Sequence, residues 1–387
     1  MPRTLYLVSF YFAPLGRADG INRTHLARML ADLGWKVEVI CADNPRGVIR
    51  NYQHDPSLLA LLGNGVERHA TPYAAWSGIA EFSSLAGLAP DPFFTWRADA
   101  IRKGMELITG DGVIMAIVPP VSNAVVAAEL ARRTGLPLVL DFRDNVANIP
   151  DAVASTVSAF CASTPHSLRE MDHRYGFGAS GREGLAYFNG YPDGIASMPP
   201  TDDASDQPPG RYLYAGLLDW RQHPAIAAQA ANLSDAPGRP ISMAFYGPRN
   251  YYTKLLLPRA LGHAATFHGY IAYGDAISRM RAMTAGVSTL YRAADAYCLP
   301  SKVFQYIATG RPVLAAAPDG ALRDFVLDNG FGLVSGPRDA AGMARDMRRL
   351  ADDAVLREEL RASVVEGRDR FSMRRQASLL SDFLETR

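Results

Sequence analysis

The sequence predicts an α/β protein built from two domains, each a parallel β-sheet with helices on its faces. Strand-like and helix-like segments alternate from residue 1 onward, which is the pattern of parallel strands joined by crossover helices. The chain has 387 residues, more than one core usually occupies. Residues 191–210 are rich in Pro, Asp and Ser and lack periodicity, so we expect a linker there. The expected domains are residues 1–190 and 211–370, followed by a last helix within residues 371–387.

The composition excludes several classes of protein. With 48% hydrophobic and 20% charged residues the chain is globular rather than disordered, and its formal net charge of +1 argues against nucleic acid as a partner. Cys41, Cys161 and Cys298 lie far apart without metal-ligand spacing, as expected for buried thiols in a reducing cytoplasm. The N-terminus lacks the features of a signal peptide, and no apolar run reaches the roughly 20 residues that span a bilayer. We therefore expect a soluble cytoplasmic protein, and contact with the inner face of the membrane is left open.

A glycine-containing loop follows the first expected strand, Thr4–Phe12. Gly16 and Gly20 let the backbone bend tightly and approach a ligand, and Arg23, in the first turn of the next helix, would point at that ligand. The apolar face of that helix is made by Leu26, Met29, Leu30 and Leu33. The loop is not a G-x-G-x-x-G fingerprint, so a nicotinamide or flavin site is not supported. A plain turn between strand and helix is the alternative interpretation.

Residues 43–100 are less regular and contain aromatic residues and prolines. Such a stretch suits an active-site lid or an acceptor-binding flank. It also suits a segment that lies on lipid headgroups, or aromatic residues that pack onto the core. All three interpretations stay open here.

Polar residues gather where a later strand ends. The strand Leu138–Leu140 runs directly into Asp141-Phe-Arg-Asp-Asn145. Ligands of parallel sheets bind at the carboxyl ends of the strands, so Arg143 and Asp144 are candidate functional residues. Asp144 has the chemistry of a general base or of a ligand for hydroxyl groups. A structural Arg143–Asp144 pair or helix cap is the alternative.

The stretch from Asp295 to Ala317 reads as a loop, a short helix, a tight stop and a buried strand. Pro300 ends the loop, and Ser301 has the side chain of an N-cap. Lys302 and Gln305, three residues apart, share the face opposite an apolar stripe. We expect free N–H groups, a hydroxyl and an ammonium at the start of this helix, which together favour a bound phosphate. A surface helix with a solvated lysine is the alternative.

The string Pro300-Ser-Lys-Val-Phe-Gln-Tyr-Ile-Ala-Thr-Gly-Arg-Pro-Val313 resembles the donor-binding signature of family-4-like glycosyltransferases of the GT-B architecture. This resemblance implies two Rossmann-like domains that face each other across a cleft, with the C-terminal helix returning to the first domain. It places Ser301, Lys302 and Val303 at the diphosphate of a nucleotide sugar. Gln305 stands where the family usually has a ribose-binding Glu, and Tyr297 stands where many members carry another Glu.

Other segments resemble the same family in the same order. They are the loop from Gly16 to Arg23, Arg143-Asp144 near the acceptor, Asn189-Gly190 at the exit of the first domain, and the loop from Gly216 to Arg221, in which Arg221 replaces a phosphate-binding Lys. The resemblance implies Arg143 and Asp144 as catalytic residues. The donor-binding residues that it implies are Gly16, Gly20, Arg23, Gly216, Arg221, Gly247, Gly269, Tyr270, Ser301, Lys302, Val303 and Gln305. His268, beside Gly269 in a loop that would meet the nucleobase, is expected to be structural.

The function that the resemblance implies is transfer of a sugar from a nucleotide-sugar donor to a carbohydrate, lipid-linked or natural-product acceptor. No D-x-D motif follows a strand, so we expect no metal and no other cofactor. Lys302, Arg221 and helix N-termini would then stabilise the leaving diphosphate. A sugar-nucleotide epimerase of the same architecture and a non-catalytic nucleotide-sugar-binding relative are the alternatives.

Overall fold

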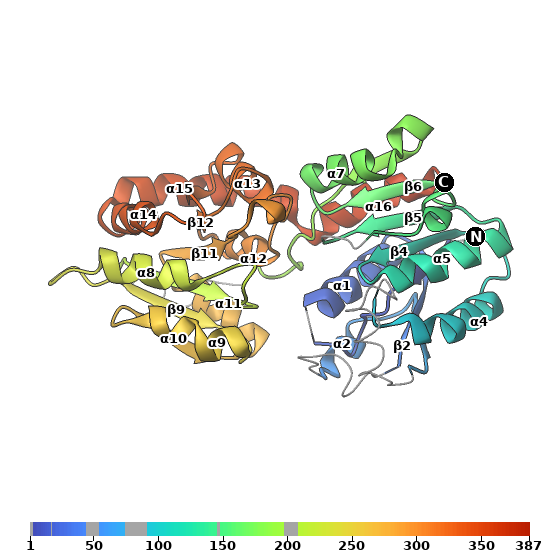
Figure 1. The fold of residues 1–387 in the computed structure, drawn as a ribbon, viewed down its shortest axis with the longest axis horizontal. Helices are drawn as coiled ribbons and strands as arrows, with labels where there is room; N and C mark the ends of the chain where they lie inside the picture. Colours follow the sequence, from blue (N-terminus) through green and yellow to red (C-terminus); the bar gives the residue numbers. More distant parts are fainter. Residues whose placement is uncertain (1–2, 17, 44–53, 74–90, 145–147, 197–207) are drawn as a thin grey trace. The chain divides into compact units, whose positions relative to one another are not determined.

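The computed structural model describes residues 3–16, 18–43, 54–73, 91–144, 148–196 and 208–387. The chain forms two compact units, shown as a ribbon in Figure 1. The first unit comprises Met1–Asn189 together with Met373–Arg387, and the second comprises Gly190–Ser372. Residues 44–53 and 74–90 of the aromatic stretch and residues 197–207 of the expected linker lie outside the described residues.

The first unit is built on a seven-stranded sheet with the order β3-β2-β1-β4-β5-β6-β7. All of its strand pairs are parallel. Its strands are β1 (Thr4–Val8), β2 (Lys36–Ala42), β3 (Val66–Thr71), β4 (Val113–Val118), β5 (Leu138–Phe142), β6 (Ala159–Ala162) and β7 (Glu183–Ala186). The strand order reverses between β1 and β4, and ligands of open parallel sheets bind beyond the carboxyl ends of strands at such a reversal.

Helices cover both faces of this sheet. They are α1 (Ala18–Asp32), α2 (Ser57–Ala60), α4 (Arg97–Leu107), α5 (Val121–Thr134), α6 (Asp151–Ala154), α7 (Pro165–Tyr175) and α16 (Met373–Glu385), with short 3₁₀ turns at Phe94–Trp96 and Gly178–Ser180. Successive residues of β1 alternate between two cores because side chains of a strand point to opposite faces. Leu5 and Leu7 join the core that contains Leu380 of α16, whereas Val8 joins the core that contains Leu130 of α5. Helix α16, the red helix in Figure 1, packs on α1.

The second unit repeats this architecture with six parallel strands in the order β10-β9-β8-β11-β12-β13. Its strands are β8 (Arg211–Ala215), β9 (Ser242–Tyr246), β10 (Ala265–Gly269), β11 (Ala285–Thr289), β12 (Val313–Ala316) and β13 (Gly332–Ser335). Its helices are α8 (Ala225–Ser234), α9 (Tyr251–Leu255), α10 (Leu257–Leu261), α11 (Tyr273–Arg281), α12 (Lys302–Ala308), α13 (Ala321–Asp328), α14 (Ala340–Asp352) and α15 (Ala354–Gly367), with 3₁₀ turns at Ala293–Asp295 and Arg368–Phe371. The strand order reverses between β8 and β11, so the segments that follow these two strands meet at one edge.

The predicted fold class, two parallel α/β domains with a C-terminal helix in the first, is confirmed. Two local expectations were wrong. The first strand ends at Val8 rather than Phe12, and Gly20 lies in the first turn of α1 rather than in a loop. Among the described residues, no helix combines the length and the apolar character needed to cross a membrane.

The reversal in the second sheet depends on a glycine in β11. A Cβ atom at Gly286 would lie 2.2–2.4 Å from ring atoms of Tyr306 in α12. That ring cannot move aside easily, because its hydroxyl accepts a hydrogen bond from the Ala215 amide at 3.1 Å and donates one to the Val287 carbonyl at 3.0 Å. Tyr306 thus fastens α12 to both β8 and β11, and the small residue at position 286 makes room for it.

We therefore expect Gly286→Ala to lower the free energy of unfolding by about 1–3 kcal/mol, the usual effect of overpacking a filled core. Urea unfolding followed by circular dichroism measures this change. Gly274→Ala in α11 is the matched control, since a Cβ atom there meets nothing within 4 Å. The control should unfold at the same or a slightly higher urea concentration, and equal behaviour of the two variants would contradict the packing argument.

Candidate functional site

Lys302, the first residue of α12, is a buried cation at the sheet edge where β8 and β11 end. Only 6% of the residue is exposed. Its Nζ atom lies 2.5 Å from Oε1 of Gln222 and 3.6 Å from the ring centroid of Tyr214. Among the described residues, no carboxylate forms an ion pair with Lys302. One neutral amide oxygen and one aromatic face are therefore the partners of this ammonium group.

Such an arrangement is unfavourable in the absence of an anion. Burial lowers the pKa of Lys302 well below its ordinary value, and the more distant charge of Asp219 opposes this shift only in part. A buried charge is normally paired, because removing an ion from water costs several kcal/mol. A cation–π contact returns about 2 kcal/mol. Among the described residues, the charge of Lys302 is therefore only partly compensated.

Two glycines shape the backbone beside this ammonium. Gly216 follows β8 and has φ +124°, a conformation that favours glycine, and a Cβ atom there would lie 3.3 Å from Cε of Lys302. A Cβ atom at Gly247 would lie 2.1 Å from the Gly216 carbonyl oxygen. The Gly247 amide in turn donates to the Gly269 carbonyl at 2.9 Å. The backbones of the segments that end β8, β9 and β10 are thus packed directly against one another. Because position 216 is a glycine, no side chain from it fills the space next to Lys302.

Arg221, expected at the diphosphate, is held by an acid that sequence reasoning missed. Its Nε atom lies 2.9 Å from Oδ1 of Asp295, and Nε of Arg292 lies 2.7 Å from Oδ2 of the same carboxylate. Arg221 also contacts the thiol of Cys298. Asp295 is 1% exposed and therefore orients both guanidinium groups. Cys298 itself is only partly buried, in contrast to the buried Cys41 and Cys161.

The start of α12 differs from the expected phosphate-binding terminus. Ser301 directly precedes α12, as predicted for an N-cap, but it adopts helical angles, φ −59° and ψ −23°, and its side chain does not make the expected capping hydrogen bond. The amides of Val303 and Phe304 donate to the carbonyls of Pro300 and Ser301, respectively. The first turn is therefore closed by its own backbone, and Lys302, not free N–H groups, is its main cationic feature. Val303 is fully buried in the core.

The remaining residues expected at the donor lie at the same carboxyl edge or near it. Gly269 ends β10 with φ +79°, and the side chain of Tyr270 after it is 58% exposed. His268 stacks on Tyr246 with ring centroids 4.9 Å apart, which fits the structural role expected for it. Gln305 in α12 is partly buried. Their contacts with a donor stay predictions.

In the first unit, Arg143 is part of a buried ion-pair network just beyond β5. Its Nε atom lies 2.7 Å from Oδ2 of Asp141, and its Nη1 atom donates to the Tyr187 carbonyl at 3.0 Å. The Tyr187 hydroxyl donates to the same Asp141 oxygen at 2.6 Å, and the Tyr187 ring lies under the guanidinium at 3.5 Å. Arg143 therefore pairs with Asp141, whereas the alternative interpretation paired it with Asp144, which lies partly buried at the following position.

A small pocket adjoins this network. It lies wholly within the first unit and is lined by Asn22, Arg23, Leu26, Arg143, Tyr187, Phe188, Asn189, Met373 and Gln376. Arg23 enters it from the second turn of α1 and is 5% exposed. Of the glycines before Arg23, Gly16 lies ahead of α1, and Gly20 allows close packing because a Cβ atom there would lie 2.3 Å from the Leu15 carbonyl oxygen.

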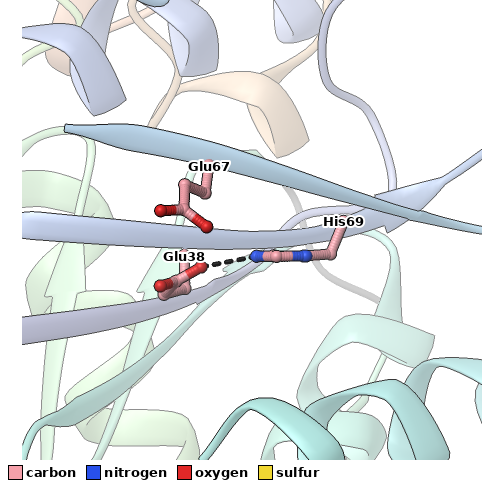
Figure 2. Close-up of side chains that lie close together, drawn as sticks. All are labelled: Glu38, Glu67 and His69. Atoms are coloured by element: carbon pink, nitrogen blue, oxygen red, sulfur yellow. Dashed lines mark hydrogen bonds and ion pairs between the residues drawn. The ribbon is translucent and has the colours of Figure 1, made fainter. Parts of the chain in front are cut away.

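A third cluster, unexpected from the sequence, lies at the edge of the first sheet. Glu38 of β2 and Glu67 and His69 of β3 bring potential metal-ligand atoms within 4.8 Å of one another (Figure 2). His69 Nε2 lies 2.5 Å from Glu38 Oε2, and Lys36 Nζ lies 2.6 Å from Glu38 Oε1. Burial raises the pKa of Glu38, but the hydrogen bonds from Lys36 and His69 outweigh it, so the pKa ends below its ordinary value. These contacts account for Glu38 and His69 as members of an ion-pair network with Lys36.

The lowered pKa of Lys302 makes a prediction about stability. Between that pKa and the ordinary value of 10.5, the unfolded chain binds more protons at this position than the folded chain. The free energy of unfolding of the ligand-free protein should therefore rise with pH through this window. Lys302→Met should remove that contribution and should be neutral or up to about 2 kcal/mol more stable than the wild type at neutral pH.

Urea unfolding of the ligand-free protein at neutral and alkaline pH measures both effects. Lys254→Met, which changes an exposed lysine of α9, is the control and should keep the wild-type pH dependence. A large loss of stability in Lys302→Met would mean that the ammonium holds the fold together and is not kept for a ligand.

Comparison with known proteins identifies the fold. No protein-family model and no curated protein sequence matches the chain. Among solved structures, sucrose-phosphate synthase from Thermosynechococcus elongatus superposes with a TM-score of 0.72 at 17% identity, over 99% of this chain and 98% of that one. HepE from Anabaena, in complex with UDP, superposes with a TM-score of 0.68 at 16% identity over 100% of both chains. The pneumococcal O-GlcNAc transferase GtfA, in complex with UDP and GlcNAc, superposes with a TM-score of 0.68 at 11% identity over 100% of this chain and 99% of that one. The chain therefore has the two-domain GT-B fold of these glycosyltransferases.

Proposed function

We propose that this protein is a glycosyltransferase that moves a sugar from a nucleotide-sugar donor to a carbohydrate, lipid-linked or natural-product acceptor, without a metal ion. The observation that carries the proposal is Lys302, a buried ammonium group without a carboxylate partner among the described residues. It lies where the strand order reverses, which is the usual ligand-binding edge of such a sheet. A diphosphate would supply the missing negative charge.

The chemistry follows from where charge develops in sugar transfer. As the bond between the sugar and the diphosphate breaks, negative charge accumulates on the leaving phosphate oxygens. A fixed cation in a site without water stabilises the transition state, in which this additional charge develops, more than it stabilises the intact donor. Such electrostatic stabilisation is commonly the largest part of catalysis. Lys302 takes this role. Arg221, oriented by Asp295, would add a forked donor to the same diphosphate.

The other residues of the second unit complete the donor site in this proposal. Gly216 lets the phosphate approach the backbone, Gln305 bonds the ribose hydroxyls, and Gly269 and Tyr270 meet the nucleobase. HepE was solved with UDP-glucose as well as with UDP, so a uridine diphosphate sugar is the first donor to test. The acceptor belongs to the first unit in this proposal, where Asp144 would bond a sugar hydroxyl or remove its proton and Arg143 would position the acceptor.

Titration calorimetry with UDP and UDP-sugars tests the donor site. Lys302→Met should weaken UDP binding about 10- to 100-fold, because it removes a hydrogen bond between charged groups that is worth about 1.5–3 kcal/mol. Lys254→Met should bind like the wild type. Equal affinity of Lys302→Met and the wild type for every nucleoside diphosphate would refute the proposal.

Turnover assays separate transfer from its alternatives. Release of UDP in the presence of an acceptor supports transfer, isomerisation of the donor alone identifies an epimerase, and donor binding without turnover identifies a binding protein. Addition of EDTA should leave the rate unchanged. Loss of turnover with EDTA, restored by Mg²⁺ or Mn²⁺, would contradict the metal-independent part of the proposal.

A further inference from the structure

The pocket of the first unit contains two buried guanidinium groups, and one of them has no direct partner in the part of the chain that the structure describes. Arg23 is 5% exposed and forms neither an ion pair nor a hydrogen bond with its side chain among the described residues. Arg143, whose side chain is 3% exposed, uses Nε and Nη1 for Asp141 and Tyr187, but its buried Nη2 atom has no hydrogen-bond partner among the described residues. Buried polar groups are normally satisfied, and those that are not often mark a ligand site.

The charges around Arg23 do not neutralise it. Burial is the largest influence on its pKa and lowers it, and the neighbouring Arg143 lowers it further. Asp141, Asp19 and Asp144 act in the opposite direction, yet the pKa still falls to about 10. At neutral pH Arg23 therefore remains charged while it is buried. Among the described residues, Asp141 is the carboxylate that joins the network directly: its Oδ2 accepts hydrogen bonds from Arg143 and Tyr187, and its buried Oδ1 has no hydrogen-bond partner and makes no ion pair with Arg23.

The size and lining of the pocket indicate what it can hold. Its empty space is about 230 Å³ when the open solvent at its mouth is counted, and its enclosed part is about large enough for one water molecule. This space suits one charged group of a larger ligand. The amides of Asn22 and Asn189 also line it, although Gln376 already accepts a hydrogen bond from the Phe188 amide at 2.8 Å. Two guanidinium groups beside amide donors are the chemistry that recognises an oxyanion.

We propose that this pocket binds an oxyanion, a carboxylate or a phosphate, that the acceptor carries. The acceptor would then be an acidic sugar or a phosphorylated one, held through this group by Arg23 and Nη2 of Arg143. The assignment of the oxyanion to the acceptor depends on the function proposed above, but binding of the oxyanion itself does not. The proposal also assigns Arg23 to the acceptor site, whereas the resemblance implied a role at the donor.

Arg23→Gln tests the proposal in the full-length protein, with inorganic phosphate and acetate as probes in titration calorimetry. The variant should unfold at the wild-type urea concentration or above it, because the guanidinium that it loses has no ion pair. Its affinity for the bound anion should fall about 10- to 100-fold. Arg28→Gln, on the same helix but in an ion pair with Asp32 at 2.8 Å, is the matched control and should bind like the wild type.

Lys302→Met separates this pocket from the donor site. The variant should keep the anion affinity that Arg23→Gln loses, and Arg23→Gln should keep the UDP affinity that Lys302→Met loses. If phosphate binds and acetate does not, the acceptor is phosphorylated, and the reverse identifies a carboxylate. Three results would overturn the inference: unchanged anion binding in Arg23→Gln, absence of anion binding in the wild type, or a loss of UDP affinity in Arg23→Gln. None of these results would by itself remove the donor site at Lys302.

Discussion

The site in the second unit depends on one electrostatic imbalance: the ammonium group of Lys302 is buried, and no carboxylate of the described residues forms an ion pair with it. The desolvation of Lys302 is offset only by the amide oxygen of Gln222, the face of Tyr214 and the distant charge of Asp219. Each is weaker than an ion pair, so the ligand-free fold has to tolerate an unfavourable contact. The fold can do so because Tyr306, one turn further along α12, is fixed to both β8 and β11. Lys302 and Tyr306 are four residues apart and therefore share a face of α12. The hydrogen bonds of Tyr306 thus fix the turn of the helix that carries the buried charge.

The sequence predicted the architecture well and the contacts unevenly, for reasons that particular residues illustrate. The alternation of strands and helices is a local property, and it was sufficient to predict both sheets and the last helix. Lys302 was singled out, but its partners Gln222 and Tyr214 lie about 80 residues away or more in the chain, and no local pattern links them to it. The acid that orients Arg221 was missed for the same reason, although the spacing of Arg292 and Asp295 is a pattern of neighbouring side chains that could have been noticed.

Other differences could have been anticipated from backbone geometry. Residues two apart on a strand share a face, so Asp141 and Arg143 at the end of β5 were better placed to pair than the adjacent Arg143 and Asp144. The capping role expected of Ser301 failed because the chain enters α12 through a turn in which Ser301 already has helical angles, and its side chain makes no capping hydrogen bond. Residue type alone predicted the cap, whereas the backbone angle that a cap requires depends on the preceding loop.

The net charge of +1 hides how the charge is distributed. Several described arginine and lysine side chains of the surface lie beside acids at one turn's spacing, as Arg28 and Asp32 do. Arg23 and Arg143 in the first unit and Lys302 in the second are instead buried, at or near the carboxyl edges of the two sheets. A protein that binds polyanions non-specifically carries its excess charge on an exposed face, but here these cations are buried. Buried cations of this kind suit single, dehydrated anionic groups, as both proposals require. That distinction explains why the overall composition does not reveal the buried cations on which the proposed binding of phosphates or carboxylates depends.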